Sequence, residues 1–177
     1  MRKRELHIPG RKSARGDLVR VEWASEGDKP GRSYRADLQS EDGGGLRLTL
    51  RASDFHDRPY TVTVYRADDD ALDRLRDMAD RYGMTAWADL PLDRDNLALD
   101  GLSTSVTLIF SEERTGRRKR AYYSISYESR LPDGAAETLR AFEDCLKQWA
   151  VPDRLLETRF ETRRGEVIED PTPSDRD

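Results

Sequence analysis

The chain has very little of the chemistry that cysteine and histidine supply. Of its 177 residues only Cys145 is a cysteine, and only His7 and His56 are histidines. A single cysteine excludes an internal disulfide framework, and two histidines leave few soft ligands for a metal ion. This usage is typical of a reducing compartment, so we expect a cytoplasmic protein without a metal or other cofactor.

Long apolar runs are also missing. No stretch reaches the roughly eighteen consecutive apolar residues from which a membrane-spanning helix is recognised. The N-terminal residues MRKRELHIPGRKSARG are basic, but no apolar segment of signal-peptide length follows them. The sequence therefore predicts neither a secretion signal nor a membrane partner.

A net charge of one sign is nearly absent, although charge itself is abundant. Asp and Glu total 35 against 31 Lys and Arg, and charged residues make up 37% of the chain. The formal net charge of −4 gives no global attraction to polyanions. Binding to nucleic acid would therefore need a local basic patch.

Motifs that carry catalysis are incomplete in this chain. The glycines at 43–45 lack the Lys-Ser/Thr of a phosphate-binding loop, and GLSTS has Ser105 where a nucleophile elbow needs glycine. His56 has no acidic or cysteine partner at metal-binding spacing. A third group lacks the spacing of a calcium loop: Asp89, Asp93, Asp95 and Asp100. We expect no catalytic residue and a protein that is not an enzyme.

Alternation of apolar and polar residues predicts four successive strands in the first half of the chain. The pattern covers residues 18–24, 34–39, 46–51 and 60–65, with turn-forming residues between the strands. Successive strands of this length favour an antiparallel meander that packs one face on the core.

Two helices and a second pair of strands follow. Asp68 to Asp70 open the first helix, which carries a stripe of Leu72, Leu75, Ala79 and Tyr82 and ends at a left-handed Gly83. A polar connection containing Trp87 leads to strands at 103–110 and 121–127. The last helix, 135–150, has one apolar stripe made of Leu139, Phe142, Leu146 and Trp149.

The order ββββαββα predicts an α+β domain, an antiparallel sheet with two helices packed on one face. We place this single domain at residues 17–160, although 153–160 have no clear pattern. Residues 1–16 are predicted to be a flexible basic arm, and 161–177 a disordered acidic tail.

The most distinctive stretch is SEERTGRRKRAYYSISY, residues 111–127, with five basic and two acidic residues in its first ten positions. A turn at Thr115-Gly116 would pair residues whose numbers sum to 231, with Tyr123 and Tyr127 on the core side and Tyr122 outside. Glu112 and Glu113 would then oppose Lys119 and Arg118. Candidate binding residues are therefore Arg114, Arg117, Arg120 and Tyr122, with Ser103 and Ser105 on the outer face.

Part of the chain resembles a group of small uncharacterised bacterial proteins. The matching segments are LDRLRDMADRYGMTAW, LDGLSTSVTLIF, ERTGRRKRAYYSISY and LPDG, within residues 60–150. They form a helix, a tryptophan loop, an Asp-Gly-x-Ser-x-Ser strand, a charged hairpin and a closing helix. The resemblance implies an α+β fold and assigns no activity.

Three functions remain open at this point. The first is a non-enzymatic protein-interaction module, acting through the hydroxyl-rich sheet face or an edge strand, or by self-association. The second is a nucleic-acid-binding protein that uses the basic arm and the hairpin tip at 114–120, whose affinity would fall steeply with salt. The third is an enzyme of unrecognised type, with a pocket of convergent acids or His56.

Overall fold

The computed structural model describes residues 14, 16–27, 33–41, 44–53, 58–93, 95, 102–114 and 116–171. Eight strands form one antiparallel sheet in the order β6-β5-β1-β2-β3-β4-β7-β8. They are β1 (Asp17–Gly27), β2 (Ser33–Ser40), β3 (Leu46–Ser53), β4 (Tyr60–Ala67), β5 (Leu102–Arg114), β6 (Arg117–Ser126), β7 (Leu155–Glu161) and β8 (Val167–Ile168). The helices are α1 (Ala71–Tyr82) and α2 (Ala135–Lys147), with short 3-10 helices η1 (Met84–Asp89) and η2 (Pro152–Arg154).

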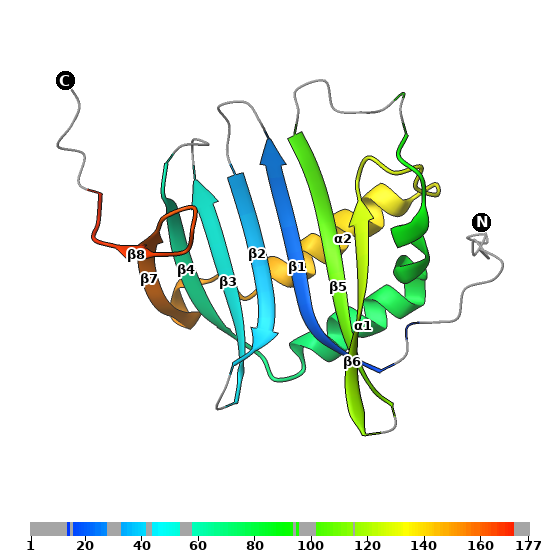
Figure 1. The fold of residues 1–177 in the computed structure, drawn as a ribbon, viewed down its shortest axis with the longest axis horizontal. Helices are drawn as coiled ribbons and strands as arrows, with labels where there is room; N and C mark the ends of the chain where they lie inside the picture. The colour runs from blue at the N-terminus through cyan, green and yellow to red at the C-terminus, as the bar shows by residue number, and fades with distance from the viewer. Residues whose placement is uncertain are drawn as a thin grey trace.

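Strand β1 lies inside the sheet, between β5 and β2. The meander β1 to β4 forms one half, the β5–β6 hairpin pairs with the other side of β1, and β7 returns to pair with β4. Figure 1 shows the strands side by side, with both helices behind them. The predicted α+β architecture is confirmed, with a larger sheet than the six expected strands would form.

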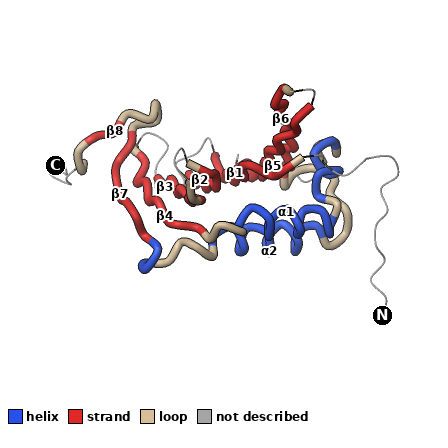
Figure 2. The backbone as a smooth tube through the Cα atoms, turned by 90° about the horizontal axis from the view of Figure 1, so that it is seen from below, coloured by secondary structure: helices blue, strands red, loops and turns tan. Residues whose placement is uncertain are grey.

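Helices α1 and α2 lie next to each other on the same face of the sheet (Figure 2). The predicted stripe of α2 is buried throughout, with at most 1% of Leu139, Phe142, Leu146 and Trp149 exposed. On α1 the buried residues are Ala71, Leu75 and Ala79. Packing these stripes on Val21, Leu38 and Leu108 of the sheet removes apolar surface from water and supplies most of the core.

The first helix differs from the prediction at its C-terminal end. Tyr82, the last residue of α1, is 46% exposed, although it lies on the same side of the helix as the buried Ala71, Leu75 and Ala79. Gly83 does take the left-handed conformation, with φ of 63°, and directs the chain into η1. There Trp87 is buried, so the predicted polar connection contributes to the core.

Strand β4 buries its large side chains on the sheet face opposite the helices, which we call the open face. Thr63 lies across from Leu50 on the helix side, so Tyr60, Val62 and Val64 point the other way and form a small cluster of their own. Arg51 and Arg159 flank Val62 in the ladders on either side, and the Arg163 guanidinium lies 4.1 Å from the Tyr60 ring centroid. Long arginine side chains thus cover this second cluster.

Ordered structure reaches past both limits that were predicted for the domain. Residues 155–161 form β7 and residues 167–168 form β8, so the sheet extends past residue 160 into the predicted acidic tail. At the other end Ala14 is buried, and Gly16 lies directly against the β5 backbone at Ser111. The rest of the arm, residues 1–13 and 15, lies outside the described residues, as do residues 172–177.

Candidate interaction surface on the β5–β6 hairpin

The hairpin has the register that its hydrophobic pattern predicts. Every pair in the ladder sums to 231, from Ser105 opposite Ser126 to Arg114 opposite Arg117. Three apolar pairs face the helices: Val106 with Ile125, Leu108 with Tyr123, and Phe110 with Ala121. The base of the hairpin is therefore packed in the core, and this packing fixes the position of its tip.

The three tyrosines of β6 and the following turn lie on the two faces of the sheet as predicted. Tyr123 packs edge-on against Phe110, with ring centroids 5.7 Å apart. The Trp23 indole donates a hydrogen bond to the Tyr127 hydroxyl at 3.0 Å, and burial raises the pKa of Tyr127 to about 12. Only Tyr122 lies on the open face, where it is 63% exposed. One aromatic side chain of the hairpin is therefore available to a partner.

The hydroxyl groups lie on the open face beside Tyr122. Ser103 is exposed and Ser105 is half-buried, and the Thr107 hydroxyl donates to Ser124 Oγ at 3.1 Å. Ser105 is four residues along β5 from Ile109, the cross-strand neighbour of Tyr122, or about 13 Å at the rise of a strand. The predicted site residues thus share one hairpin and do not form one cluster, because the serines lie at its base and the arginines at its tip.

The tip of the hairpin is a cluster of exposed cations. Arg117, Arg118, Lys119 and Arg120 are all exposed. Glu113 and Glu112 oppose Arg118 and Lys119 in the ladder as predicted, yet no ion pair joins the hairpin's acids and bases among the residues the structure describes. Figure 1 shows the tip extending beyond the neighbouring strands. Of Arg114 only the backbone is described, paired with Arg117.

Elsewhere on the open face several arginines have acidic partners. Asp37 accepts two hydrogen bonds from Arg20, at 2.9 and 2.6 Å, and Arg35 pairs with Glu26. Glu161, only 5% exposed, accepts from Arg51 at 3.1 Å and from Arg159 at 2.8 Å. The sequence pattern did not reveal this network because three of its four pairs join different strands, which only the sheet brings together.

Strand β6 ends the sheet, and only part of its outer side is covered. Beyond Ser126 the chain pairs with the segment after η1: Asp93 N–H donates to Glu128 O at 2.7 Å, and Arg130 N–H to Pro91 O at 2.8 Å. No strand of the described chain pairs with the outer side of residues 117–122. We call this stretch the free edge. At alternate residues its backbone N–H and C=O groups point away from β5, and no strand of the described chain pairs with them.

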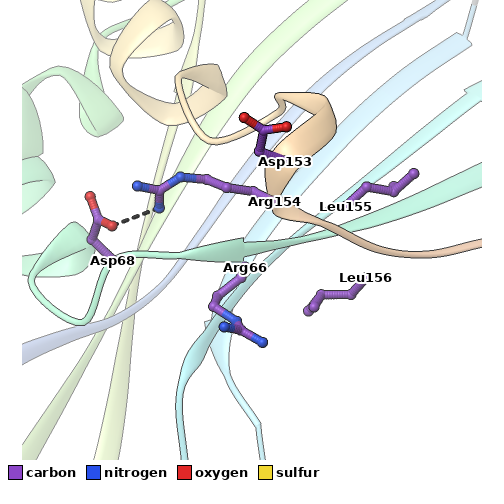
Figure 3. A pocket seen from close by; sticks show the side chains of 6 residues that line it. All are labelled: Arg66, Asp68, Asp153, Arg154, Leu155 and Leu156. Carbon is purple, nitrogen blue, oxygen red and sulfur yellow. Dashed lines mark hydrogen bonds and ion pairs between the residues drawn. The ribbon is translucent and has the colours of Figure 1, made fainter.

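A pocket of about 410 Å³ lies at the other end of the molecule, lined by Arg66, Asp68, Asp153, Arg154, Leu155 and Leu156 (Figure 3). Arg154 donates to the Asp68 carboxylate at 2.6 Å, and so do Arg74 of α1 and Trp149, which lies just beyond the end of α2. Figure 3 shows Arg66 pointing away from this ion pair. No histidine, cysteine or serine lines the pocket, and its central carboxylate already holds three structural contacts.

The residues weighed as catalytic or metal-binding are dispersed. His7, His56 and Asp100 lie outside the described residues. Cys145 is half-buried on α2, where burial raises the pKa of its thiol. Within the described ranges, no three His, Cys, Asp or Glu side chains gather to hold a metal ion, and no helix is long and apolar enough to cross a membrane.

Comparison with known proteins adds no relative to this picture. No protein-family model matches the chain, and neither the curated proteins nor the solved structures yield a significant match.

Proposed function

We propose that this protein is a non-enzymatic interaction module that binds an extended segment of a partner protein along the free edge of β6. The observation that carries the proposal is the unpaired outer side of residues 117–122, on a hairpin anchored in the core. An extended peptide can add to such an edge as a further strand, with main-chain hydrogen bonds supplying affinity and side chains supplying specificity.

The opposite end of the sheet supports this choice by contrast. Strand β8 has only two residues, Val167 and Ile168, and pairs with the last two residues of β7. The outer side of residues 155–159 of β7 also lacks a partner strand in the described chain, but the charges on this stretch are already paired, since Arg159 contacts both Glu157 and Glu161. The hairpin offers six consecutive residues, with Tyr122 beside them as an exposed apolar contact.

A selection from a library of random decapeptides tests the proposal and needs no identified partner. Peptides selected on the protein should lose binding when alternate backbone amides are N-methylated, since N-methylation removes the donors that pair with an edge strand. They should also fail to bind a variant with Arg120→Pro, which removes a backbone N–H that points away from β5, once circular dichroism has established that this variant folds. Selected peptides that tolerate both changes would count against strand addition.

Nucleic-acid binding is the second candidate. It is favoured by the same exposed cations, Arg117 to Arg120, which have no acidic partner within the described chain. Fluorescence anisotropy with single-stranded DNA and RNA at low ionic strength tests it. Affinity should decrease steeply with salt if phosphates are the ligands.

A further inference from the structure

Resting on the proposed function, we infer that the partner segment of the free edge is acidic, with a run of about four carboxylates opposite residues 117–120 and an apolar residue opposite Tyr122. The inference concerns the chemistry of the partner. It follows from the charge along the edge, the two faces on which that charge lies, and the position of the single exposed aromatic ring.

Four cations occupy successive positions of the free edge. Since side chains alternate across a strand, Arg118 and Arg120 lie on the open face with Tyr122, and Arg117 and Lys119 lie on the other face. A strand that pairs here meets positive charge on both of its faces. Acidic side chains at successive positions of the partner pair with the cations on both faces. Acids at alternate positions would pair with the cations of one face only.

The same charge prevents the edge from pairing with itself. If two copies joined through residues 117–120, cations of one copy would oppose cations of the other, and like charges directly across a ladder are destabilising. Lysine and arginine on an edge strand are a common protection against such aggregation. An acidic partner converts this repulsion into attraction, so that one set of residues serves both purposes.

The position of Tyr122 determines at which end of the acidic run the partner's apolar residue lies. It lies two residues beyond Arg120 on the same face, opposite Ile109, and Ile109 is only 3% exposed. Tyr122 therefore has a buried apolar neighbour and is itself exposed to a partner. In antiparallel addition, the partner's apolar residue precedes its acids in sequence.

A peptide also fits the free edge better than a nucleic acid does. The edge presents backbone donors and acceptors in alternation, and a peptide strand pairs with both. Phosphate groups only accept hydrogen bonds and would leave the carbonyl groups of β6 to water. Stacking platforms for single strands use several aromatic side chains, and Tyr122 is the exposed aromatic of the hairpin.

Fluorescence anisotropy with labelled peptides of defined sequence tests this inference on the full chain. The first probe is Ile-Thr-Glu-Glu-Glu-Glu, and its counterparts carry Gln or Lys in place of Glu. We expect the Glu peptide to bind at least about tenfold more tightly than the Gln peptide in low salt, because four exposed charge pairs each add a modest factor. The difference should shrink as salt screens the charges, and the Lys peptide should not bind.

Matched variants assign the effect to the free edge. Arg118→Gln with Arg120→Gln should remove most of the preference for Glu over Gln. Arg140→Gln with Arg164→Gln changes the net charge equally at exposed sites elsewhere and should leave the preference intact. All four positions are exposed, and thermal unfolding of each double variant verifies its fold.

The outcomes separate the two claims. Equal binding of the Glu and Gln peptides, with sensitivity to N-methylation, would overturn the acidic partner and retain strand addition. Failure of the Glu peptide to bind in low salt would also overturn the acidic partner, and the peptide selection then decides strand addition by itself. Tighter binding of a hexanucleotide than of the Glu peptide, abolished by the Arg118/Arg120 variant, would assign the hairpin to nucleic acid and overturn both.

Discussion

Trp149, just beyond the end of α2, donates its indole N–H to the carboxylate of Asp68 at 3.1 Å, across 81 residues of sequence. Asp68 lies between β4 and α1, and the same carboxylate accepts from Arg74 of α1 and Arg154 of η2. One side chain thus joins the two helices to the segment that leads into β7.

Asp68→Asn should lower the midpoint of thermal unfolding. The amide keeps the shape of the side chain and removes the charge that Arg154 and Arg74 pair with. Asp69→Asn, at the exposed neighbouring position, should change the midpoint much less. Equal midpoints for the two variants, followed by circular dichroism, would show that Asp68 has no special role.

Acid should destabilise the protein through Glu161 and Asp68. Burial disfavours the charged form of Glu161, but hydrogen bonds from Arg159 and Arg51 outweigh it and hold its pKa below the usual range. Hydrogen bonds from Arg154 and Trp149 lower the pKa of Asp68 to about 2. Because both folded-state pKa values are lower than the unfolded values, these groups stabilise the fold above about pH 4.5, and this contribution is lost as the pH falls.

The measurement is the urea midpoint between pH 6 and pH 2. The wild type should lose stability steeply over the acidic part of this range, and the double variant Glu161→Gln with Asp68→Asn should start lower and decline less. Parallel curves for the two proteins would exclude these carboxylates as the source of acid sensitivity.

Val62→Ala should destabilise the protein although Val62 faces away from the helices. Its side chain is fully buried, and loss of two methyl-sized groups costs about 1.5 kcal/mol. Val167→Ala makes the same change at a residue that is 67% exposed, and should alter the free energy of unfolding by less than about 0.5 kcal/mol. Urea titration distinguishes the two, and similar values would mean that the arginine-covered cluster contributes nothing.

Local periodicity was sufficient to predict the meander, both helices and the register of the hairpin. In these segments the apolar residues recur at strand or helix spacing, as in Val106, Leu108 and Phe110, all fully buried. Strand β7 could not be predicted in this way. Its open-face residues are Glu157, Arg159 and Glu161, and its neighbour β4 supplies the buried valines.

The candidate site, like the fold, could be predicted only in part. The pattern identified the exposed Tyr122 and the basic tip, because both depend on the register of one hairpin. It predicted partners for Arg118 and Lys119 that form no ion pair in the described chain. It could not indicate which side of β6 is uncovered, because strand order depends on contacts between segments distant in sequence.

Gly16→Ala should destabilise the start of β1 more than Gly116→Ala destabilises the hairpin turn. Both glycines have positive φ, 88° and 72°, so an added methyl group strains the backbone at either position. Only at Gly16 would the new Cβ also collide with the backbone, 2.2 Å from the Ser111 carbonyl oxygen. Equal losses of stability in urea titrations would contradict this close packing.

Amide hydrogen exchange of β6, with and without the Ile-Thr-Glu-Glu-Glu-Glu peptide, tests the central claim most directly. Strand addition predicts slower exchange of backbone amides within residues 117–122 when the peptide is bound, with no change in α1. Peptide binding that leaves these amides unprotected, or protects α1 in their place, would contradict an interaction site at the free edge of β6.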